Sequence, residues 1–357
     1  MTDIRIIKAC DLTPEQTLQW QEIAAADRYL QSPFLQPAFT QEVARVRDDV
    51  QIALMESGGQ LQGVFPFQNG PRGLLRNVSG RLSEFHTPIV SPGFMPDMPE
   101  LLRACGRSWW QFDHLPVSES ALATHVWGTT NSPFIDLSMG FDHYVQERKS
   151  AGSSMSNALR KMRKLEREVG PIRFEYNTTS EAAFQQLVAW KDDQHRRTGR
   201  LRVFAYDWLQ QLLRNLKSEN AANDIGIFST LHVGDKLAAV HLGLRNASVI
   251  HLWFPAYAPE LEEYSPGLIL LLRLAQEAAT RGVVRLDLGR GTERYKANFK
   301  SGDIMIAEGA VDLRPVAGRL RKRWYETKRW LRNSKWEKQF AWPMELTRRL
   351  RQKMAFE

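Results

Sequence analysis

The sequence predicts a mixed α/β fold in which a mixed sheet is flanked by helices. Its clearest strand pattern is a succession of three β-like runs, at residues 225–233, 236–245 and 249–254, separated by turn signals. Two helical segments precede these runs, and an apolar helix followed by one more strand comes after them. This alternation is typical of a sheet that is covered by helices.

The end signals of these segments set the order of the elements. Ser180 is the expected N-cap of the first helix, which ends before Gly199, and the second helix is expected at residues 207–216. The apolar helix covers about residues 267–281, and the last strand covers residues 283–288. The polar residues of the apolar helix share one stripe, so we expect the rest of its surface to pack on the sheet.

The N-terminal third predicts a separate mixed lobe. A helix is expected at residues 37–46, and the runs 50–55 and 61–67 on either side of a Ser-Gly-Gly turn predict a hairpin. A further helix is expected at residues 101–110, with a strand behind it at residues 111–115.

The composition is that of a globular protein. The chain has 357 residues, of which 43% are hydrophobic and 25% are charged, so collagen, coiled coil and bulk disorder are excluded. No apolar run is long enough to cross a bilayer, and the first residues lack the apolar core of a signal peptide, so we expect a cytoplasmic protein. Cys10 and Cys105 lie outside any metal-binding spacing, so no metal is expected.

The positive charge is concentrated near the C-terminus. Residues 314–353 carry 14 Lys and Arg against three acidic residues, and because the net charge is +8, the remainder of the chain is at −3. Nucleic acid is therefore not an expected partner of the remainder. Four tryptophans in this segment are spaced six residues apart and point in several directions on a helix. Packing on the protein is one interpretation, and peripheral contact with an anionic membrane through residues 319–353 is another.

Several motifs in the C-terminal half resemble those of one family. They are Lys191-x-x-Gln194 with Arg197-Thr198-Gly199, Trp253-Phe254-Pro255-Ala256-Tyr257, Tyr264-Ser265-Pro266-Gly267, Leu286-Asp287-Leu288-Gly289 and Tyr295-Lys296. With them, the segment 138–313 resembles the GNAT acyltransferase domain of the CelD-like cellulose and exopolysaccharide biosynthesis family, a distant relative of the Fem peptidyltransferases. Ala258 departs from the pattern, because an Asp is expected there, so a role for that carboxylate is not carried over.

The resemblance implies two tandem GNAT-like lobes. Weaker matches at Ser32-Pro33-Phe34 and Phe65-Pro66-Phe67 extend it to the N-terminal third. The expected division is an N-terminal lobe at residues 1–137, an acyltransferase domain at 138–313 and a basic, Trp-rich helical tail at 314–357.

Ser265, Pro266 and Gly267 are the expected binding site for the pyrophosphate of acyl-CoA. A Ser N-cap, a Pro at the first helical position and a Gly without a side chain leave backbone N–H groups and the positive helix end open to an anion. The alternative is that these residues only start a buried helix. The standard Gln/Arg-x-x-Gly-x-Gly/Ala form of the loop is absent.

His241 and His251 are the expected catalytic residues, because imidazole titrates near neutral pH and can take the proton that an attacking amine or hydroxyl loses. Alternation along the two strands puts both on the face opposite the apolar residues. A three-residue turn at 246–248 aligns His241 with Trp253. It also aligns His251 with Gly243, which places both rings near a common substrate, whereas a two-residue turn does not. A buried structural role is the alternative for each histidine.

The acceptor substrate is expected to meet polar and aromatic residues of the same half. The resemblance implies this role for Lys191, Gln194, Trp253, Tyr257, Tyr295 and Lys296. Lys191 and His195 lie one helical turn apart and can line a polar pocket, and Lys296 can meet a phosphate or a developing oxyanion. Solvent-exposed helix and loop positions are the alternative.

The predicted function is transfer of an acyl group, acetyl above all, from acyl-CoA to an amine or hydroxyl of a sugar, polysaccharide or cell-envelope precursor. A Fem-like transferase that uses aminoacyl-tRNA is one alternative, and the basic run at residues 159–165 is the feature that favours it. A non-catalytic GNAT-fold binding or membrane-adaptor protein is the other.

Overall fold

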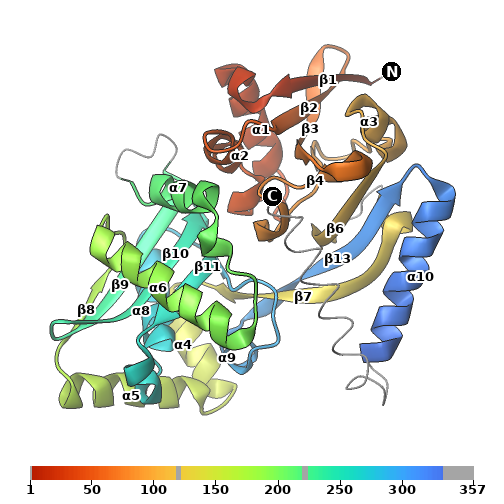
Figure 1. The fold of residues 1–357 in the computed structure, drawn as a ribbon. Coiled ribbons are helices and arrows are strands. Elements are labelled where there is room, and N and C mark those ends of the chain that lie inside the picture. Colours follow the sequence, from red (N-terminus) through yellow and green to blue (C-terminus); the bar gives the residue numbers. More distant parts are fainter. Residues whose placement is uncertain (1, 118–121, 219–223, 333–357) are drawn as a thin grey trace. The chain divides into compact units, whose positions relative to one another are not determined.

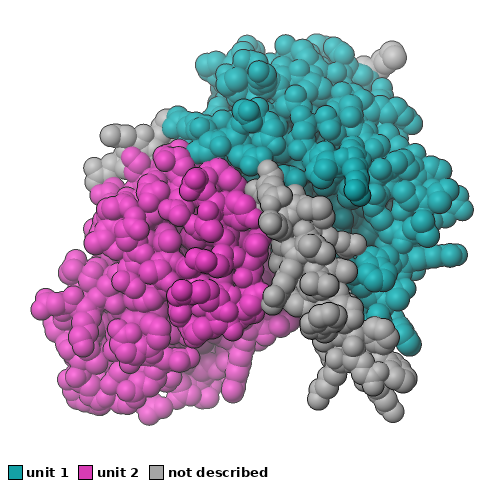
Figure 2. Space-filling model, viewed as in Figure 1, with its two compact units in different colours: residues 1–130, 305–357 teal, residues 131–304 magenta. Residues whose placement is uncertain are grey.

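The computed structural model describes residues 2–117, 122–218 and 224–332 (Figure 1). Unit 1 comprises Met1–Thr130 and Met305–Glu357, and unit 2 comprises Asn131–Ile304 (Figure 2). The limits at Thr130 and Ile304 fall within the strands Val126–Asp136 and Gly302–Asp312, and the expected boundaries at 137 and 313 stay a prediction.

Unit 1 is built on a sheet with helices packed against it. Its strands, in spatial order, are β1 (Asp3–Lys8), β2 (Val50–Ser57), β3 (Gln60–Asn69), β4 (Leu74–Arg76), β6 (Trp109–Pro116) and β13 (Gly302–Asp312), and β5 (Ile89–Val90) pairs with β3. Its helices are α1 (Pro14–Ala25), α2 (Pro37–Ala44), α3 (Met98–Ala104) and α10 (Pro315–Arg332). The core gathers around Trp110, whose ring lies 5.0 Å from those of Phe65 and Phe112.

Unit 2 contains the predicted meander at the centre of its sheet. The strands run in the spatial order β7 (Val126–Asp136), β12 (Arg285–Asp287), β11 (Val249–Tyr257), β10 (Lys236–Arg245), β9 (Gly226–Val233) and β8 (Ile172–Glu175). Of these, β11 and β12 are parallel, and the other neighbours are antiparallel. The crossover between the two parallel strands is α8 (Pro266–Thr280).

The other helices of unit 2 are α4 (Phe141–Ser150), α5 (Ser154–Glu168), α6 (Glu181–Thr198), α7 (Asp207–Leu216) and α9 (Arg294–Phe299). In Figure 1, α6 and α7 lie in front of the strands and α8 lies behind them. Ser180 caps α6 as predicted, because its Oγ accepts a hydrogen bond of 3.2 Å from the Ala183 N–H.

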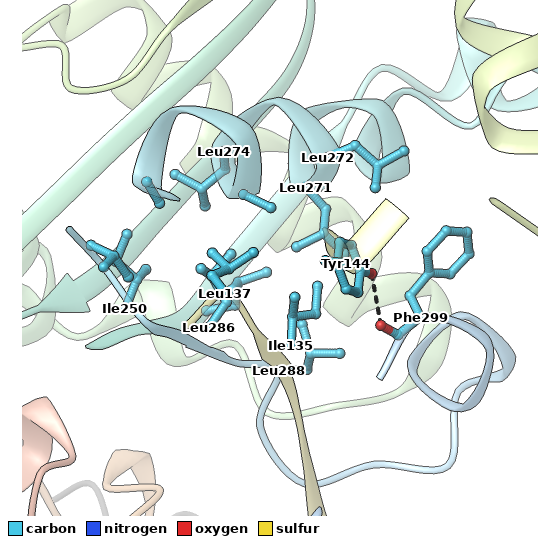
Figure 3. Close-up of a cluster of buried hydrophobic side chains, with 14 of the residues drawn as sticks. Ile135, Leu137, Tyr144, Ile250, Leu271, Leu272, Leu274, Leu286, Leu288 and Phe299 are labelled. Carbon is cyan, nitrogen blue, oxygen red and sulfur yellow. Dashed lines mark hydrogen bonds between the residues drawn. The ribbon is translucent and has the colours of Figure 1, made fainter. Parts of the chain in front are cut away.

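The apolar helix α8 packs on the sheet as the sequence predicts. Figure 3 shows Leu271, Leu272 and Leu274 of this helix facing strand residues such as Ile250 and Leu286. Tyr144 of α4 closes the cluster, and its hydroxyl donates a hydrogen bond of 2.7 Å to the carbonyl of Phe299. This burial holds the N-terminal end of α8 in a fixed position relative to β11.

Two expectations about the fold are corrected. The helix expected at residues 101–110 ends with α3 at Ala104, because Gly106 takes a φ of 65° and stops it, and Trp109 already belongs to β6. The strands β7 and β13 were not expected. None of the described helices is long and apolar enough to cross a membrane.

Candidate active site

A fork between two parallel strands lies at the centre of unit 2. Strands β11 and β12 pair at three positions, the last of which joins His251 to Asp287. Beyond this pair β12 ends, whereas β11 continues to Tyr257. The backbone of β11 past His251 is therefore released from β12, at the carboxyl ends of parallel strands where α/β sheets bind ligands.

His251 and Asp287 form a buried pair at the point of the fork. The side chain of His251 is fully buried and that of Asp287 is 1% exposed, and Nδ1 of the imidazole lies 3.9 Å from Oδ2 of the carboxylate. Arg285 places Nε 2.9 Å from the other carboxylate oxygen. Asp287 is thus a site residue that sequence reasoning missed as such, although the Leu286-Asp287-Leu288-Gly289 motif contained it.

His241 on β10 is a second buried histidine. Its side chain is fully buried, and neither ring nitrogen has a hydrogen-bond partner among the described residues. Burial, together with the neighbouring His251 and Lys191, lowers its pKa to about 3. His241 is therefore neutral at physiological pH, and its unpaired nitrogens are the kind of buried polar atoms that a ligand can satisfy.

The predicted alignment of the two histidines is wrong. Arg245 pairs with Ile250, so the hairpin has the short turn for which that alignment fails. His251 is opposite Leu244, and an irregularity in the ladder at Gly243 then places His241 opposite Pro255. The rings still influence each other, because His251 contributes to the lowered pKa of His241.

Gly243 makes room for this arrangement. A Cβ atom at this position would lie 2.4 Å from the carbonyl oxygen of His251 and 2.6 Å from two ring atoms of His241. A side chain cannot be accommodated there without moving one of the two histidines. The absence of a side chain at Gly243 therefore allows His241 and His251 to occupy their observed positions.

The C-terminal half of α6 carries polar residues near His241. Lys191 donates a hydrogen bond of 3.2 Å to Gln194 Oε1, and burial together with the nearby charge of Arg200 lowers the pKa of Lys191 to about 8. Burial also lowers the pKa of His195, with Lys191 and Arg200 adding to the effect. A lysine and histidines with weakened affinity for protons are typical of functional sites.

An aromatic series connects the end of α6 with β11. The His195 ring lies 5.9 Å from Phe204, which lies 5.1 Å from Phe254, and Phe254 lies 4.6 Å from Trp253. Phe204 belongs to a 3-10 turn at Val203–Ala205 and was not among the expected site residues. Phe204 is an apolar residue six positions after the end of α6, and nothing in the local sequence indicates that it contacts the site.

The start of α8 differs in detail from the expected N-cap. Ser265 has a left-handed backbone with φ of 57° and makes no side-chain capping bond. Its Oγ instead accepts a hydrogen bond of 2.8 Å from Nζ of Lys161 on α5. Pro266 is buried, and a Cβ at Gly267 would meet only the ring of Tyr257, at 3.4 Å. Lys161 thus lies at the N-terminal, positive end of α8, and the lysine charge and the helix dipole both favour binding of an anion there.

Lys296 holds the loop that follows β12. Its ammonium donates hydrogen bonds of 3.0 and 3.1 Å to the carbonyls of Gly289 and Arg290. Its side chain is mostly buried, and the neighbouring Tyr295 packs against the core of Figure 3. These contacts give Lys296 a structural role, and substrate binding by Tyr295 and Lys296 stays a prediction.

Comparison with known families identifies the fold of this site. Residues 152–297, which include the fork, α6 and the start of α8, match the family model described as acetyltransferase (GNAT) domain. Unit 2 contains a GNAT fold. The predicted fold class is therefore confirmed. The comparison does not reach the CelD-like assignment, which stays a prediction.

Solved structures with the same fold extend over both units. FemX is 9% identical, covers 86% of this chain and 98% of its own, and has a TM-score of 0.57. The C-terminal domain of a putative lysylphosphatidylglycerol synthetase from Agrobacterium fabrum is 12% identical, with coverages of 86% and 94% and a TM-score of 0.51. A tandem GNAT protein from the clavulanic acid biosynthesis pathway is 11% identical, with coverages of 88% and 99% and a TM-score of 0.50. No curated protein matched the sequence.

Within the GNAT domain the predicted residues fall into three groups, apart from Trp253, which belongs to the aromatic series. The histidines at the fork and Lys191 with Gln194 form the first, since the charge of Lys191 is felt by His241. Ser265, Pro266 and Gly267 with Tyr257 form the second, at the start of α8. Tyr295 and Lys296 form the third, in the segment that follows the loop after β12. Among the described residues no cluster of His, Cys, Asp and Glu suits a metal ion.

Proposed function

We propose that the protein is an acyltransferase that moves an acyl group, acetyl above all, from acyl-CoA to an amine or hydroxyl of a sugar, polysaccharide or cell-envelope precursor. The observation that carries this proposal is the buried His251–Asp287 pair at the fork of β11 and β12, within the part of the chain that matches an acetyltransferase domain. In this proposal the acyl donor binds at the start of α8, the proton acceptor is a histidine at the fork, and both lie in unit 2.

The donor is assigned to the start of α8 and the free edge of β11. Its pyrophosphate would accept hydrogen bonds from the N–H of Gly267 and from Nζ of Lys161, because Pro266 has no N–H and the N–H groups of Leu268 and Ile269 donate to the Ser265 carbonyl. Its thioester would lie along the backbone of β11 beyond His251, where N–H groups can stabilise the oxyanion that forms.

The chemical step is attack of the acceptor nitrogen or oxygen on the thioester carbonyl. The acceptor loses a proton to a histidine, the tetrahedral intermediate collapses, and the coenzyme A thiolate leaves and is protonated. His251 is the better placed base because the negative charge of Asp287 beside its ring stabilises the imidazolium that forms, and His241 is the second candidate. Lys191, Gln194, Trp253 and Tyr257 are proposed to position the acceptor.

Thermal unfolding with acetyl-CoA and longer acyl-CoAs tests the donor. A ligand at about 100 times its dissociation constant adds about 2.7 kcal/mol to the free energy of unfolding. Gly267→Glu should abolish this shift, because a carboxylate at the helix start repels phosphate, while a Cβ at this position makes only ordinary contact with the Tyr257 ring and lets the variant fold. Gln276→Glu adds the same charge at an exposed position of α8 and should retain the shift. If acyl-CoA stabilises both variants equally, the donor does not bind at the start of α8.

A Fem-like transferase that takes its acyl group from aminoacyl-tRNA is the second candidate. The observation in its favour is the exposed Arg160 and Arg163 on α5, which leave a basic surface near Lys161. Tight binding of tRNA at physiological salt, with no response to acyl-CoA, would favour this candidate. A non-catalytic binding protein would bind acyl-CoA without turnover, or neither ligand.

A further inference from the structure

Helix α10 is attached to unit 1 through one of its faces. Arg321 forms an ion pair with Asp312, and its guanidinium stacks 3.7 Å above the ring of Trp109. One turn later the ring of Tyr325 lies 5.5 Å from that of Trp127. These contacts fix which side of the helix faces the protein.

The outer side of α10 exposes large apolar residues. Val316 is 67% exposed, Leu320 62% and Trp324 43%, and they follow one another at intervals of four residues. Trp330 is 62% exposed. At 100° per residue the four side chains fall within an arc of about 120° on the side away from Arg321. Soluble proteins rarely expose such a row, so it indicates an interaction surface.

Basic residues accompany this row. Residues 315–332 contain seven Lys and Arg and one acidic residue, Glu326. Arg319 and Arg323 are exposed and lie at or beside the apolar arc, while Lys322 and Arg329 are exposed further round the helix. The partner of this surface must therefore be negatively charged and must also accept tryptophan and aliphatic side chains.

We propose that the outer face of α10 binds an anionic lipid surface, with Val316, Leu320, Trp324 and Trp330 at the level of the headgroups. Tryptophan and arginine are favoured together at that depth, and a basic amphipathic helix lies in the plane of the interface. A second copy of the helix would bring two strongly positive surfaces together, and a nucleic acid would leave the aliphatic residues exposed. This attachment would hold a transferase next to a membrane-bound acceptor, but it does not depend on the reaction.

Sedimentation of the full chain with vesicles tests the proposal. The protein should bind vesicles in which about a third of the lipid is phosphatidylglycerol, should not bind phosphatidylcholine alone, and should be released by salt. Replacing Arg319 and Arg323 with Ala should weaken binding about 30-fold, at roughly fivefold for each charge. The triple change Val316→Ser, Leu320→Ser and Trp324→Ser should abolish it.

Two matched substitutions control for general effects of surface mutation. Leu18→Ser removes a leucine of α1 that is 56% exposed, and Arg103→Ala removes an exposed arginine from α3. Both variants should bind vesicles like the wild type. Circular dichroism establishes that each variant is folded. The proposal is overturned if the triple variant binds anionic vesicles normally, if both lipid compositions bind equally, or if the triple change only dissociates a dimer.

Discussion

The imidazole Nδ1 of His251 lies 3.9 Å from Oδ2 of Asp287, at the last position where β11 and β12 pair. Arg285 approaches the other carboxylate oxygen at 2.9 Å, so the carboxylate is held in place without any substrate. This separation is longer than a hydrogen bond, so the carboxylate acts on the imidazole through its negative charge, which stabilises the protonated ring. In the proposed reaction this charge stabilises the imidazolium that forms when His251 takes the proton of the acceptor substrate.

Asp287→Asn should lower turnover by up to about 10²-fold, because the amide keeps the shape of the carboxylate but removes its charge. The acid limb of the pH–rate profile should also move to lower pH, since the protonated imidazole loses its counterion. Steady-state kinetics over a pH series measures both effects. Asp142→Asn, at an exposed position of α4, is the control. A stability loss with an unchanged profile would make Asp287 purely structural.

His251→Gln and His241→Gln test the proton acceptor directly. Loss of the general base should reduce turnover by roughly 10²- to 10⁴-fold, with substrate-induced stabilisation retained. His232→Gln changes a half-buried histidine of β9 and should leave turnover close to that of the wild type. If both single variants keep full activity, neither histidine takes part in the chemical step.

His241 makes stability depend on pH in a defined direction. Burial lowers its pKa from 6.5 to about 3, so between these values the unfolded chain binds a proton that the native protein does not. Its contribution is fully present above pH 6.5 and is lost as the pH falls toward 3. Between neutral pH and pH 4, the free energy of unfolding of the wild type should fall by roughly 3 kcal/mol more than that of His241→Gln. Urea unfolding at both pH values measures this difference. His143→Gln, which replaces an exposed histidine of α4, is the matched control.

Gly243→Ala should destabilise unit 2 by about 1–3 kcal/mol, because the added methyl group meets the His251 carbonyl and the His241 ring. Turnover should fall with it, since relief of the clash moves one of the histidines. Gly267→Ala is the matched control for stability, because its methyl group meets only the Tyr257 ring at ordinary contact distance. Equal stability of the two variants would show that the fork tolerates the extra volume.

The sequence was most informative where local signals are strong. The meander of β9, β10 and β11 has apolar runs separated by turns, and α6 begins where Ser180 caps it. By contrast β13 has glycines at both 302 and 309 and an acidic residue at 308, which interrupt its apolar pattern. Its place in the sheet depends on pairing with β6, nearly two hundred residues away in sequence.

The candidate site was predictable in its residue types and not in its geometry. The irregularity at Gly243 shifts the ladder by one residue and changes which residues face each other, and no local pattern encodes such a shift. The pairing of His251 with Asp287 arises from a parallel contact across the α8 crossover. Likewise Lys161 reaches Ser265 from 104 residues away.

Calorimetric titration of the full chain with acetyl-CoA and with tRNA, each at physiological salt, is the most direct test of the proposed donor. We expect one acetyl-CoA to bind per chain, Gly267→Glu to abolish this binding while Gln276→Glu retains it, and tRNA to bind weakly. Tight binding of tRNA together with no binding of acetyl-CoA would contradict the proposed donor.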